Sequence, residues 1–324
     1  MTAGAFHSVD DNSPGPTGAS VDLVSLVVAT YGRGSELGPL MDALVAQTDR
    51  AFEVIVVDQN RDDRVVPVIE AARAAGLAIS HVRQPEANLS LARNGGLQHA
   101  RGSIVAFPDD DCWYEPDVIA RVRERFGADR AIDGVVARWV EAEPQGPRPA
   151  HRLSSDAWRQ FRGGDATSFT LFFKPERVRA LGGFDTRLGT GQWFGSGEET
   201  DLVMRMLAAG DRVEHVPDAR IHHWFSDVLP LSWANWRRSR SYGRGTGALY
   251  AKHRLSAWVM LRGLVAPFLH AVKLPRPLDA LALAGAKTLG RLEGCVLWAI
   301  THGRTGTRPH TDQETAQNTR EQPR

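Results

Sequence analysis

The stretch that decides the fold is IVAFPDDDCW, residues 104–113. Its first four residues are apolar, which predicts a short strand buried on both faces of a sheet. Pro108 has no N–H for the ladder of a central strand, so we expect the strand to end before it. Asp109, Asp110 and Asp111 follow directly. Three adjacent carboxylates repel one another unless a cation or hydrogen-bond donors neutralise them.

The position of these aspartates predicts a metal site. Open α/β sheets bind their ligands at the carboxyl ends of the strands. Hard carboxylate oxygens gathered at such an edge suit Mg²⁺ or Mn²⁺ together with a phosphate. The alternative is a solvated acidic turn that caps the next helix, and Pro116 near the start of that helix is compatible with it.

The composition is that of an ordinary soluble protein. The chain has 324 residues, 42% of them apolar, with a net charge of +1, so its overall charge does not favour nucleic acid as a partner. Two distant cysteines, Cys112 and Cys295, give neither a disulfide framework nor zinc spacing. We find no signal peptide in the polar first 20 residues, and no uncharged apolar run of about 18–20 residues that would span a bilayer. We therefore expect a cytoplasmic protein.

Strands and helices alternate through the first half of the chain, which predicts an α/β fold with parallel strands. The second half is less regular and adds further strands, so we expect a mixed, mostly parallel sheet flanked by helices. The expected strands are 21–30, 52–57, 79–82, 104–107, 132–140, 168–173 and 212–216, and the main expected helices are 35–46, 65–75, 89–100 and 199–209.

The chain ends in a basic helical region. Residues 257–272 and 278–300 are apolar at helical spacing but carry scattered charges. Such helices pack on the rest of the protein or a partner subunit, or lie on an anionic membrane as a peripheral contact. The expected divisions are a disordered N-terminus at 1–20, the α/β domain at 21–230, the helical extension at 231–304 and a disordered tail at 305–324. No oligomeric state is predicted.

Polar residues follow several of the expected strands. Thr30 and Tyr31, Asp58, and the aspartate triplet should meet at one edge, since parallel strands share it. A carboxylate such as Asp58 can accept a hydrogen bond from a nucleobase, or cap a turn. Arg33 and Arg93 could bind phosphate bidentately, or serve as ordinary surface charges.

A second acidic cluster, Glu198, Glu199 and Asp201, opens a helix behind the glycine-rich loop 189–197. The carboxylates either interact with the helix dipole or include a general base for an acceptor hydroxyl. Trp193 and Phe194 in that loop are suited to contact an acceptor sugar ring. The pair His222 and His223 is structural, or supplies one imidazole to a metal held by the aspartates.

Four stretches occur in a characteristic order. They are 27–33 (VVATYGR), 54–58 (VIVVD), 92–96 (ARNGG) followed by 107–111 (FPDDD), and 182–185 (GGFD) with 197–202 (GEETDL). Together they resemble the family 2 glycosyltransferases of the GT-A fold, over residues 25–225. The resemblance implies an inverting enzyme that uses a nucleoside diphosphate sugar and a divalent metal. The basic C-terminal helices resemble those of members that glycosylate lipid-linked acceptors, so we expect a glycan or lipid-linked acceptor in cell-envelope or exopolysaccharide synthesis.

The resemblance also implies roles for matching positions. A nucleotide-sugar site would include Thr30, Tyr31, Arg33, Asp58, Arg93, Asp109 and Asp110. The metal ligands would be Asp111 and Asp109, with His222 the first choice for a late histidine and His223 the second. Glu199 stands where the family usually has an aspartate base, which leaves Glu198 and Asp201 as alternatives.

Two other functions fit parts of the sequence. A haloacid-dehalogenase-type phosphatase also has an Asp-x-Asp after a strand, but Cys112 and Trp113 follow here and no matched lysine is found. A non-catalytic module that binds nucleotide sugars would have lost its acidic groups, and they are present. A nicotinamide enzyme is not supported, because no G-x-G-x-x-G follows the first strand.

Overall fold

The structure is a computed structural model that describes residues 7–8, 20–142, 149–162, 166–224 and 229–302. The sequence predicts disorder at both ends of the chain, over residues 1–20 and 305–324. These two segments lie outside the described residues, apart from positions 7, 8 and 20.

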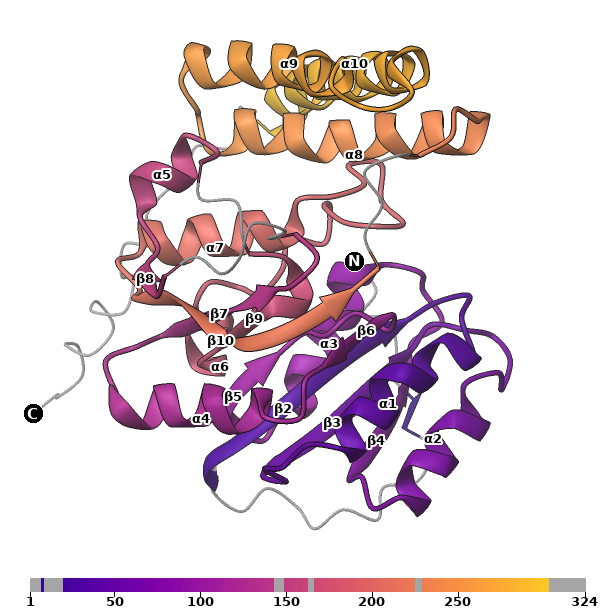
Figure 1. Cartoon of the computed structure of the whole chain (residues 1–324), viewed down its shortest axis with the longest axis vertical. Helices are drawn as coiled ribbons and strands as arrows, with labels where there is room; N and C mark the ends of the chain where they lie inside the picture. Colours follow the sequence, from indigo (N-terminus) through magenta and orange to yellow (C-terminus); the bar gives the residue numbers. More distant parts are fainter. Residues whose placement is uncertain (1–6, 9–19, 143–148, 163–165, 225–228, 303–324) are drawn as a thin grey trace, which may run out of the picture.

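One mixed sheet organises the described chain (Figure 1). Its order is β1-β4-β3-β2-β5-β9-β7-β10-β6, and β8 pairs with β10. The β4, β3, β2 and β5 ladders are parallel, whereas β9 runs antiparallel to both β5 and β7. The strands are β1 (His7–Ser8), β2 (Ser20–Thr30), β3 (Phe52–Asp58), β4 (Ile79–Arg83), β5 (Gly102–Ala106), β6 (Cys112–Tyr114), β7 (Gly134–Trp139), β8 (His151–Arg152), β9 (Leu171–Phe173) and β10 (Val213–His223). The expected mixed, mostly parallel sheet is confirmed.

Helices cover both faces of the sheet, which explains why the central strands are continuous apolar runs. Along β2, Val24, Leu26 and Val28 face one core, and Val27 and Ala29 face the other. The first core contains side chains of α1 (Gly38–Val45), α2 (Val66–Ala74) and α4 (Val118–Ala128). The second contains side chains of α3 (Leu89–His99), α6 (Pro175–Ala180) and α7 (Glu198–Ala208). Shorter helical segments are η1 (Ser35–Leu37), η2 (Ser168–Thr170) and α5 (Ser155–Arg159).

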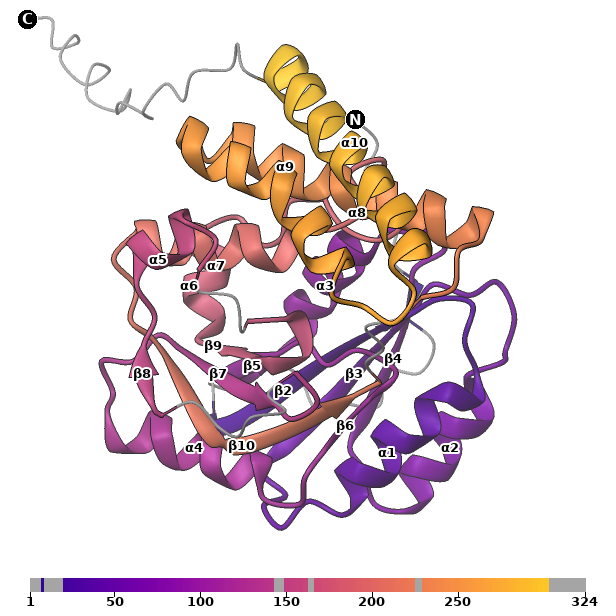
Figure 2. The same ribbon diagram turned by 45° about the horizontal axis from the view of Figure 1, so that its top comes forward.

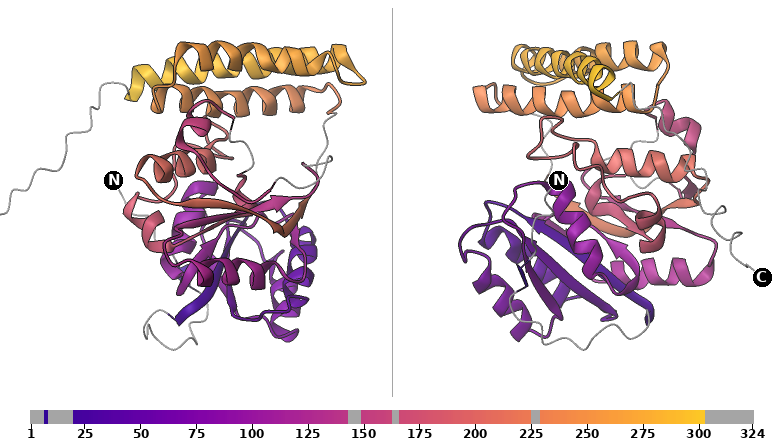
Figure 3. Two further views of the ribbon diagram at one scale, coloured as in Figure 1. Left: turned by 60° about the vertical axis from the view of Figure 1, so that its left-hand side comes forward. Right: turned by 180° about the vertical axis from the view of Figure 1, so that it is seen from behind.

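Three C-terminal helices form a layer above α7 (Figures 2 and 3). They are α8 (Trp233–Lys252), α9 (Ala257–Ala271) and α10 (Pro277–His302). Glycines let the backbones of α8 and α10 approach closely. A Cβ added at Gly247 would lie 2.0 Å from the carbonyl oxygen of Arg291, and one at Gly294 would lie 2.0 Å from that of Arg244. The helices α8 and α10 are therefore tightly packed against each other.

The helix α8 is attached directly to the glycine-rich loop. The backbone N–H of Gly195 donates to the carbonyl of Ser241 at 3.2 Å, and the Ser196 hydroxyl donates to the carbonyl of Tyr242 at 2.9 Å. The helices α9 and α10 lie on the side of α8 away from the sheet (Figure 3). The C-terminal region thus holds the loop that precedes α7.

Candidate active site

The aspartate triplet lies at the carboxyl edge of the parallel strands, as expected for an open α/β sheet. Asp109 forms a parallel bridge with Ala29 of β2 just beyond the end of β5. The Thr30 hydroxyl at the end of β2 donates to Asp110 Oδ2 at 2.7 Å. The ends of β2 and β5 therefore meet, and the next strand, β3, ends alongside them at Asp58, which pairs with Thr30.

The three aspartates have different partners. Asp109 Oδ1 accepts from Arg93 Nη2 at 2.8 Å and from the Ser168 hydroxyl at 3.0 Å. Asp110 contacts Thr30 and Arg33, while Asp111 lies beside Arg33 and His223. Ser168, on η2, was not identified from the sequence, because no motif marks it.

The pKa values of two of these carboxylates shift in opposite directions. Burial raises the pKa of Asp110 to about 6, although the charge of Arg33 opposes the shift. Burial also works to raise the pKa of Asp111, but hydrogen bonds from His223 and Arg33 outweigh it and lower that pKa to about 2. Asp111 is therefore an anion at neutral pH, and its charge is available to a cation.

The structure brings His223, rather than His222, to the aspartates. One ligand atom from each of Asp109, Asp111 and His223 lies within 4.8 Å of the other two. His223 Nε2 is 3.1 Å from Asp111 Oδ1. His222 instead lies between Glu141 and Glu115, with its ring nitrogens 2.6 and 3.2 Å from their oxygens. Adjacent residues of a strand point to opposite faces, so only one of the two histidines can reach the triplet.

Arg93 connects the triplet to α7. It is 2% exposed, and its guanidinium bridges Asp109 and Glu198, with Nη1 3.0 Å from Glu198 Oε1. Glu199 follows on the first turn of α7. Its partial burial, and then the charge of Glu198, raise the pKa of Glu199 well above the usual value for a glutamate.

Asp201 belongs to a different cluster. It lies 2.8 Å from Arg205 Nε, 2.7 Å from Lys252 Nζ and 2.9 Å from His253 Nε2. Two of these groups come from the C-terminal end of α8. Asp201 is completely buried, so its contacts attach α7 to α8.

Asp58 is completely buried at the end of β3. Its Oδ1 accepts from the backbone and side-chain nitrogens of Asn60 at 2.9 and 2.8 Å, and its Oδ2 is 3.0 Å from His81 Nε2. Burial acts to raise the pKa of Asp58, but the hydrogen bonds from His81 and Asn60 outweigh it and lower the pKa. Tyr31 is 62% exposed at the same edge. Asp58 is therefore enclosed by protein groups at this edge of the sheet, while Tyr31 faces solvent.

Comparison with known proteins identifies the family. Residues 25–181 match the sequence model for Glycosyl transferase family 2. The chain is 30% identical over 239 residues to the succinoglycan biosynthesis protein ExoM of Rhizobium meliloti, covering 71% of this chain and 75% of that protein. The chain belongs to glycosyltransferase family 2. It is also 25% identical to a glucosyl-dolichyl phosphate glucuronosyltransferase of Haloferax volcanii, covering 68% of this chain and 75% of that protein.

Solved structures of similar shape show the fold of the chain. The mannosyltransferase PcManGT of Pyrobaculum calidifontis, in complex with GDP-Man and Mn²⁺, has a TM-score of 0.57 at 19% identity, covering 90% of this chain and 85% of that one. S. aureus TarS in complex with UDP-GlcNAc has a TM-score of 0.52 at 15% identity, covering 84% and 90%. The chain therefore has the GT-A fold and is a glycosyltransferase, and the phosphatase and the non-catalytic alternatives are not supported.

The glycine-rich loop of this glycosyltransferase presents one of its two aromatic residues. Trp193 is 44% exposed, and the Arg244 guanidinium lies 4.3 Å from the centre of its ring. Phe194 is only 7% exposed and packs edge-on against Trp298 of α10, with ring centres 5.2 Å apart. Phe194 therefore fixes the loop to the helical layer, and Trp193 is the more exposed of the two aromatic residues.

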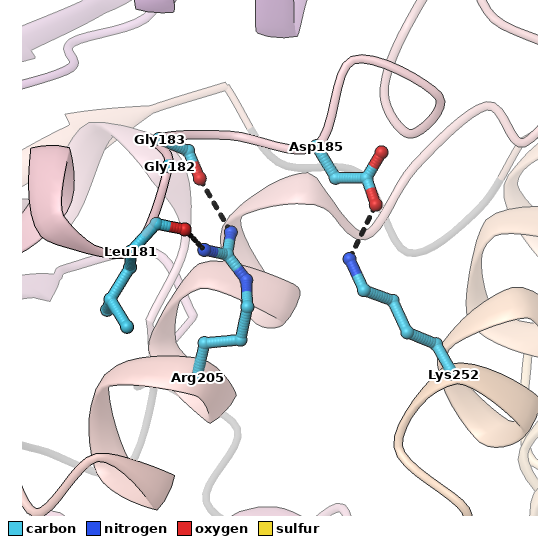
Figure 4. Close-up of a pocket in the computed structure, with 6 residues that line it drawn as sticks. All are labelled: Leu181, Gly182, Gly183, Asp185, Arg205 and Lys252. Atoms are coloured by element: carbon cyan, nitrogen blue, oxygen red, sulfur yellow. Dashed lines mark hydrogen bonds and ion pairs between the residues drawn. The ribbon is translucent and has the colours of Figure 1, made fainter. Parts of the chain in front are cut away.

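A cavity of about 210 Å³ lies beside α7 (Figure 4), and none of Asp109, Asp110 and Asp111 is among its lining residues. Arg205 donates to the carbonyls of Leu181 and Gly183 at 2.8 and 2.7 Å, and Lys252 donates to Asp185 at 2.6 Å. Both cations thus have partners within the cavity wall. The cavity lies at the junction where the GGFD turn contacts α7 and Lys252 of α8.

Proposed function

We propose that this family 2 enzyme is a metal-dependent, inverting glycosyltransferase that uses a nucleoside diphosphate sugar. The observation that carries the proposal is the grouping of Asp109, Asp111 and His223 at the sheet edge, connected through Arg93 to the acidic start of α7. Two carboxylates and an imidazole are a donor set that suits Mn²⁺ or Mg²⁺. The complexes of PcManGT with GDP-Man and Mn²⁺ and of TarS with UDP-GlcNAc support the donor class and the metal.

In this proposal the ion, when bound, neutralises the diphosphate and makes it a better leaving group. Asp109, Asp111 and His223 would hold it. The Arg93 guanidinium and the Ser168 hydroxyl fix the orientation of the Asp109 carboxylate. Thr30, Tyr31 and Asp58 would form the nucleoside end of the site, with the Asp58 carboxylate acting through Asn60 and His81.

Glu199 is the proposed general base. A base must be ionised to accept the proton of the acceptor hydroxyl, and a pKa raised toward the working pH makes the group a more effective acceptor. Activity should therefore rise with pH through the pKa of Glu199. Glu198 is bound by Arg93, and Asp201 is bound by Arg205, Lys252 and His253. Within the described part of the chain, Glu199 is thus the carboxylate of this cluster that has no ion pair with a Lys, Arg or His.

A screen of nucleoside diphosphate sugars tests this function. We expect one donor with Mn²⁺ to raise the melting temperature, because a ligand at a hundredfold excess over its Kd stabilises the folded state by about 2.7 kcal/mol. The same donor with EDTA should give little shift. Equal stabilisation without metal would contradict the metal dependence, and no shift with any donor would contradict the donor class. Product analysis by NMR should show inversion at the anomeric carbon.

The acceptor is proposed to be a glycan or lipid-linked glycan used in exopolysaccharide or cell-envelope synthesis. ExoM is named for succinoglycan biosynthesis, and the Haloferax volcanii relative is named a glucosyl-dolichyl phosphate glucuronosyltransferase. Trp193 at the glycine-rich loop provides an exposed aromatic face on which a sugar ring can stack.

We also propose that the C-terminal layer lies on the surface of an anionic membrane. Residues 229–278 contain nine Lys and Arg and no Asp or Glu, although the whole chain has a net charge of +1. On α9, Trp258, Leu261, Val265 and Leu269 are exposed at helical spacing, and the C-cap residue Val272 is exposed as well. None of the helices in the described part of the chain is long and apolar enough to cross a bilayer. A basic region with an exposed apolar helix face is typical of a helix at the membrane interface.

Vesicle binding tests the membrane contact. We expect the full-length chain to sediment with vesicles containing phosphatidylserine but not with neutral vesicles, and to be released by salt. The double substitution Leu261→Ser with Leu269→Ser should weaken binding at least tenfold, because it removes two apolar contacts of about 1.5–3 kcal/mol each. Light scattering tests the alternative explanation, in which this exposed face joins two copies of the chain. Equal binding by the double variant, or concentration-dependent dimers without vesicle binding, would contradict the proposal.

A further inference from the structure

The guanidinium of Arg33 lies on the aspartate triplet. Its Nη1 is 2.9 Å from Asp110 Oδ1 and 2.5 Å from Asp111 Oδ2. Asp111 is one of the three proposed metal ligands, and its other oxygen faces His223. Arg33 is therefore the side chain that neutralises the outer oxygen of Asp111. A divalent cation that approaches this oxygen competes with the guanidinium for it, because both are cations and both bind the same carboxylate.

The backbone beside Arg33 is held by hydrogen bonds, whereas its side chain is partly exposed to solvent. The Gly32 N–H donates to Asn60 Oδ1 at 2.6 Å, and the Gly32 carbonyl accepts from Arg64 Nη1 at 3.0 Å. The Arg33 side chain is 38% exposed. Rotation about its side-chain bonds can thus remove the guanidinium from the carboxylates without unfolding the loop between β2 and η1.

We propose that Arg33 occupies the position of the divalent cation at Asp111, and that it transfers to the diphosphate of the donor when metal and donor bind together. Guanidinium groups bind phosphate oxygens bidentately, so the displaced side chain gains a new partner. This inference rests on the proposed function. It predicts that metal and nucleotide each strengthen the binding of the other, because both favour the same displaced position of Arg33.

Mn²⁺ titration of the full-length protein without nucleotide tests the inference, with free Mn²⁺ measured by electron paramagnetic resonance. We expect Arg33→Gln to bind Mn²⁺ roughly tenfold more tightly than the wild type, within the usual range of coupling between sites. Arg33→Lys keeps a cation at this position and should stay close to the wild type. Arg61→Gln removes the same charge from an exposed position near the end of β3 and serves as the matched control.

A second titration adds UDP or GDP. Nucleotide should tighten Mn²⁺ binding to the wild type by more than it does in Arg33→Gln, since the variant has no guanidinium to transfer. A gain in metal affinity is not a result that damage to the fold produces. If Arg33→Gln binds Mn²⁺ no more tightly than the wild type, the role of Arg33 is wrong while the metal site stands. If neither protein binds Mn²⁺, with or without nucleotide, the proposed metal site fails and this inference fails with it.

Discussion

Asp111→Ala should reduce kcat/KM roughly a thousandfold, because the metal at this position is expected to contribute about 4 kcal/mol of transition-state stabilisation. The pKa of Asp111 is lowered to about 2, so its carboxylate is ionised throughout the working pH range. It is one of three proposed ligands, and its loss leaves only Asp109 and His223. Steady-state kinetics with saturating Mn²⁺, together with a Mn²⁺ titration, should show that metal affinity and activity fall together.

The fold should survive this substitution. Alanine removes one of three adjacent like charges, which relieves part of their mutual repulsion and offsets the lost contacts with His223 and Arg33. Asp117→Ala is a matched control, because its partner Arg121 forms an exposed pair on α4 and such pairs contribute about 0–1 kcal/mol. Full turnover by Asp111→Ala, or an equal loss in Asp117→Ala, would contradict the assignment of the metal site.

The sequence predicted those parts of the site that depend on sheet topology. Apolar runs buried on both faces identified β2, β3 and β5, and the rule that parallel strands share a carboxyl edge placed Thr30, Asp58 and the triplet together. The direction of each side chain was not predictable in the same way. Asp109, Asp110 and Asp111 are adjacent in sequence, yet each has a different partner in the structure.

The choice between His222 and His223 shows why the direction of a side chain was not predictable. Along a regular strand, alternation would assign each residue to a face, but the register of β10 against β7 shifts between Val216 and Arg220. A bulge of this kind changes which residues of the strand face a given side. Pro217 within the shifted segment indicates an interrupted ladder, but it does not fix which face each histidine takes. Phe194 and Asp201 likewise owe their burial to residues of α8 and α10 that are distant in sequence. A local pattern could not predict these tertiary contacts.

Glu199→Gln should lower kcat by a factor of about 10²–10⁴, the usual contribution of a positioned general base, while donor affinity stays close to that of the wild type. Glutamine keeps the shape of the side chain but cannot accept the proton. Wild-type kcat should fall as the pH falls through the raised pKa of Glu199, and the residual activity of the variant should lose this dependence. Thermal shift measures donor affinity and product formation measures kcat, so the two assays distinguish a loss of binding from a loss of catalysis.

The same substitution should stabilise the fold. The pKa of Glu199 in the folded protein lies above the ordinary value of 4.5, so the unfolded chain releases this proton more readily and stability is lost as the pH rises between the two values. Glutamine carries no charge and avoids that loss, so the melting temperature should be higher than that of the wild type at neutral pH.

Glu198→Gln and Asp201→Asn are the comparison variants, and both should lower stability because they break buried ion pairs with Arg93 and with Lys252. If either of them loses kcat as fully as Glu199→Gln while keeping donor affinity, that carboxylate is the base instead. A destabilised Glu199→Gln with unchanged kcat would remove the acid–base role from this position altogether.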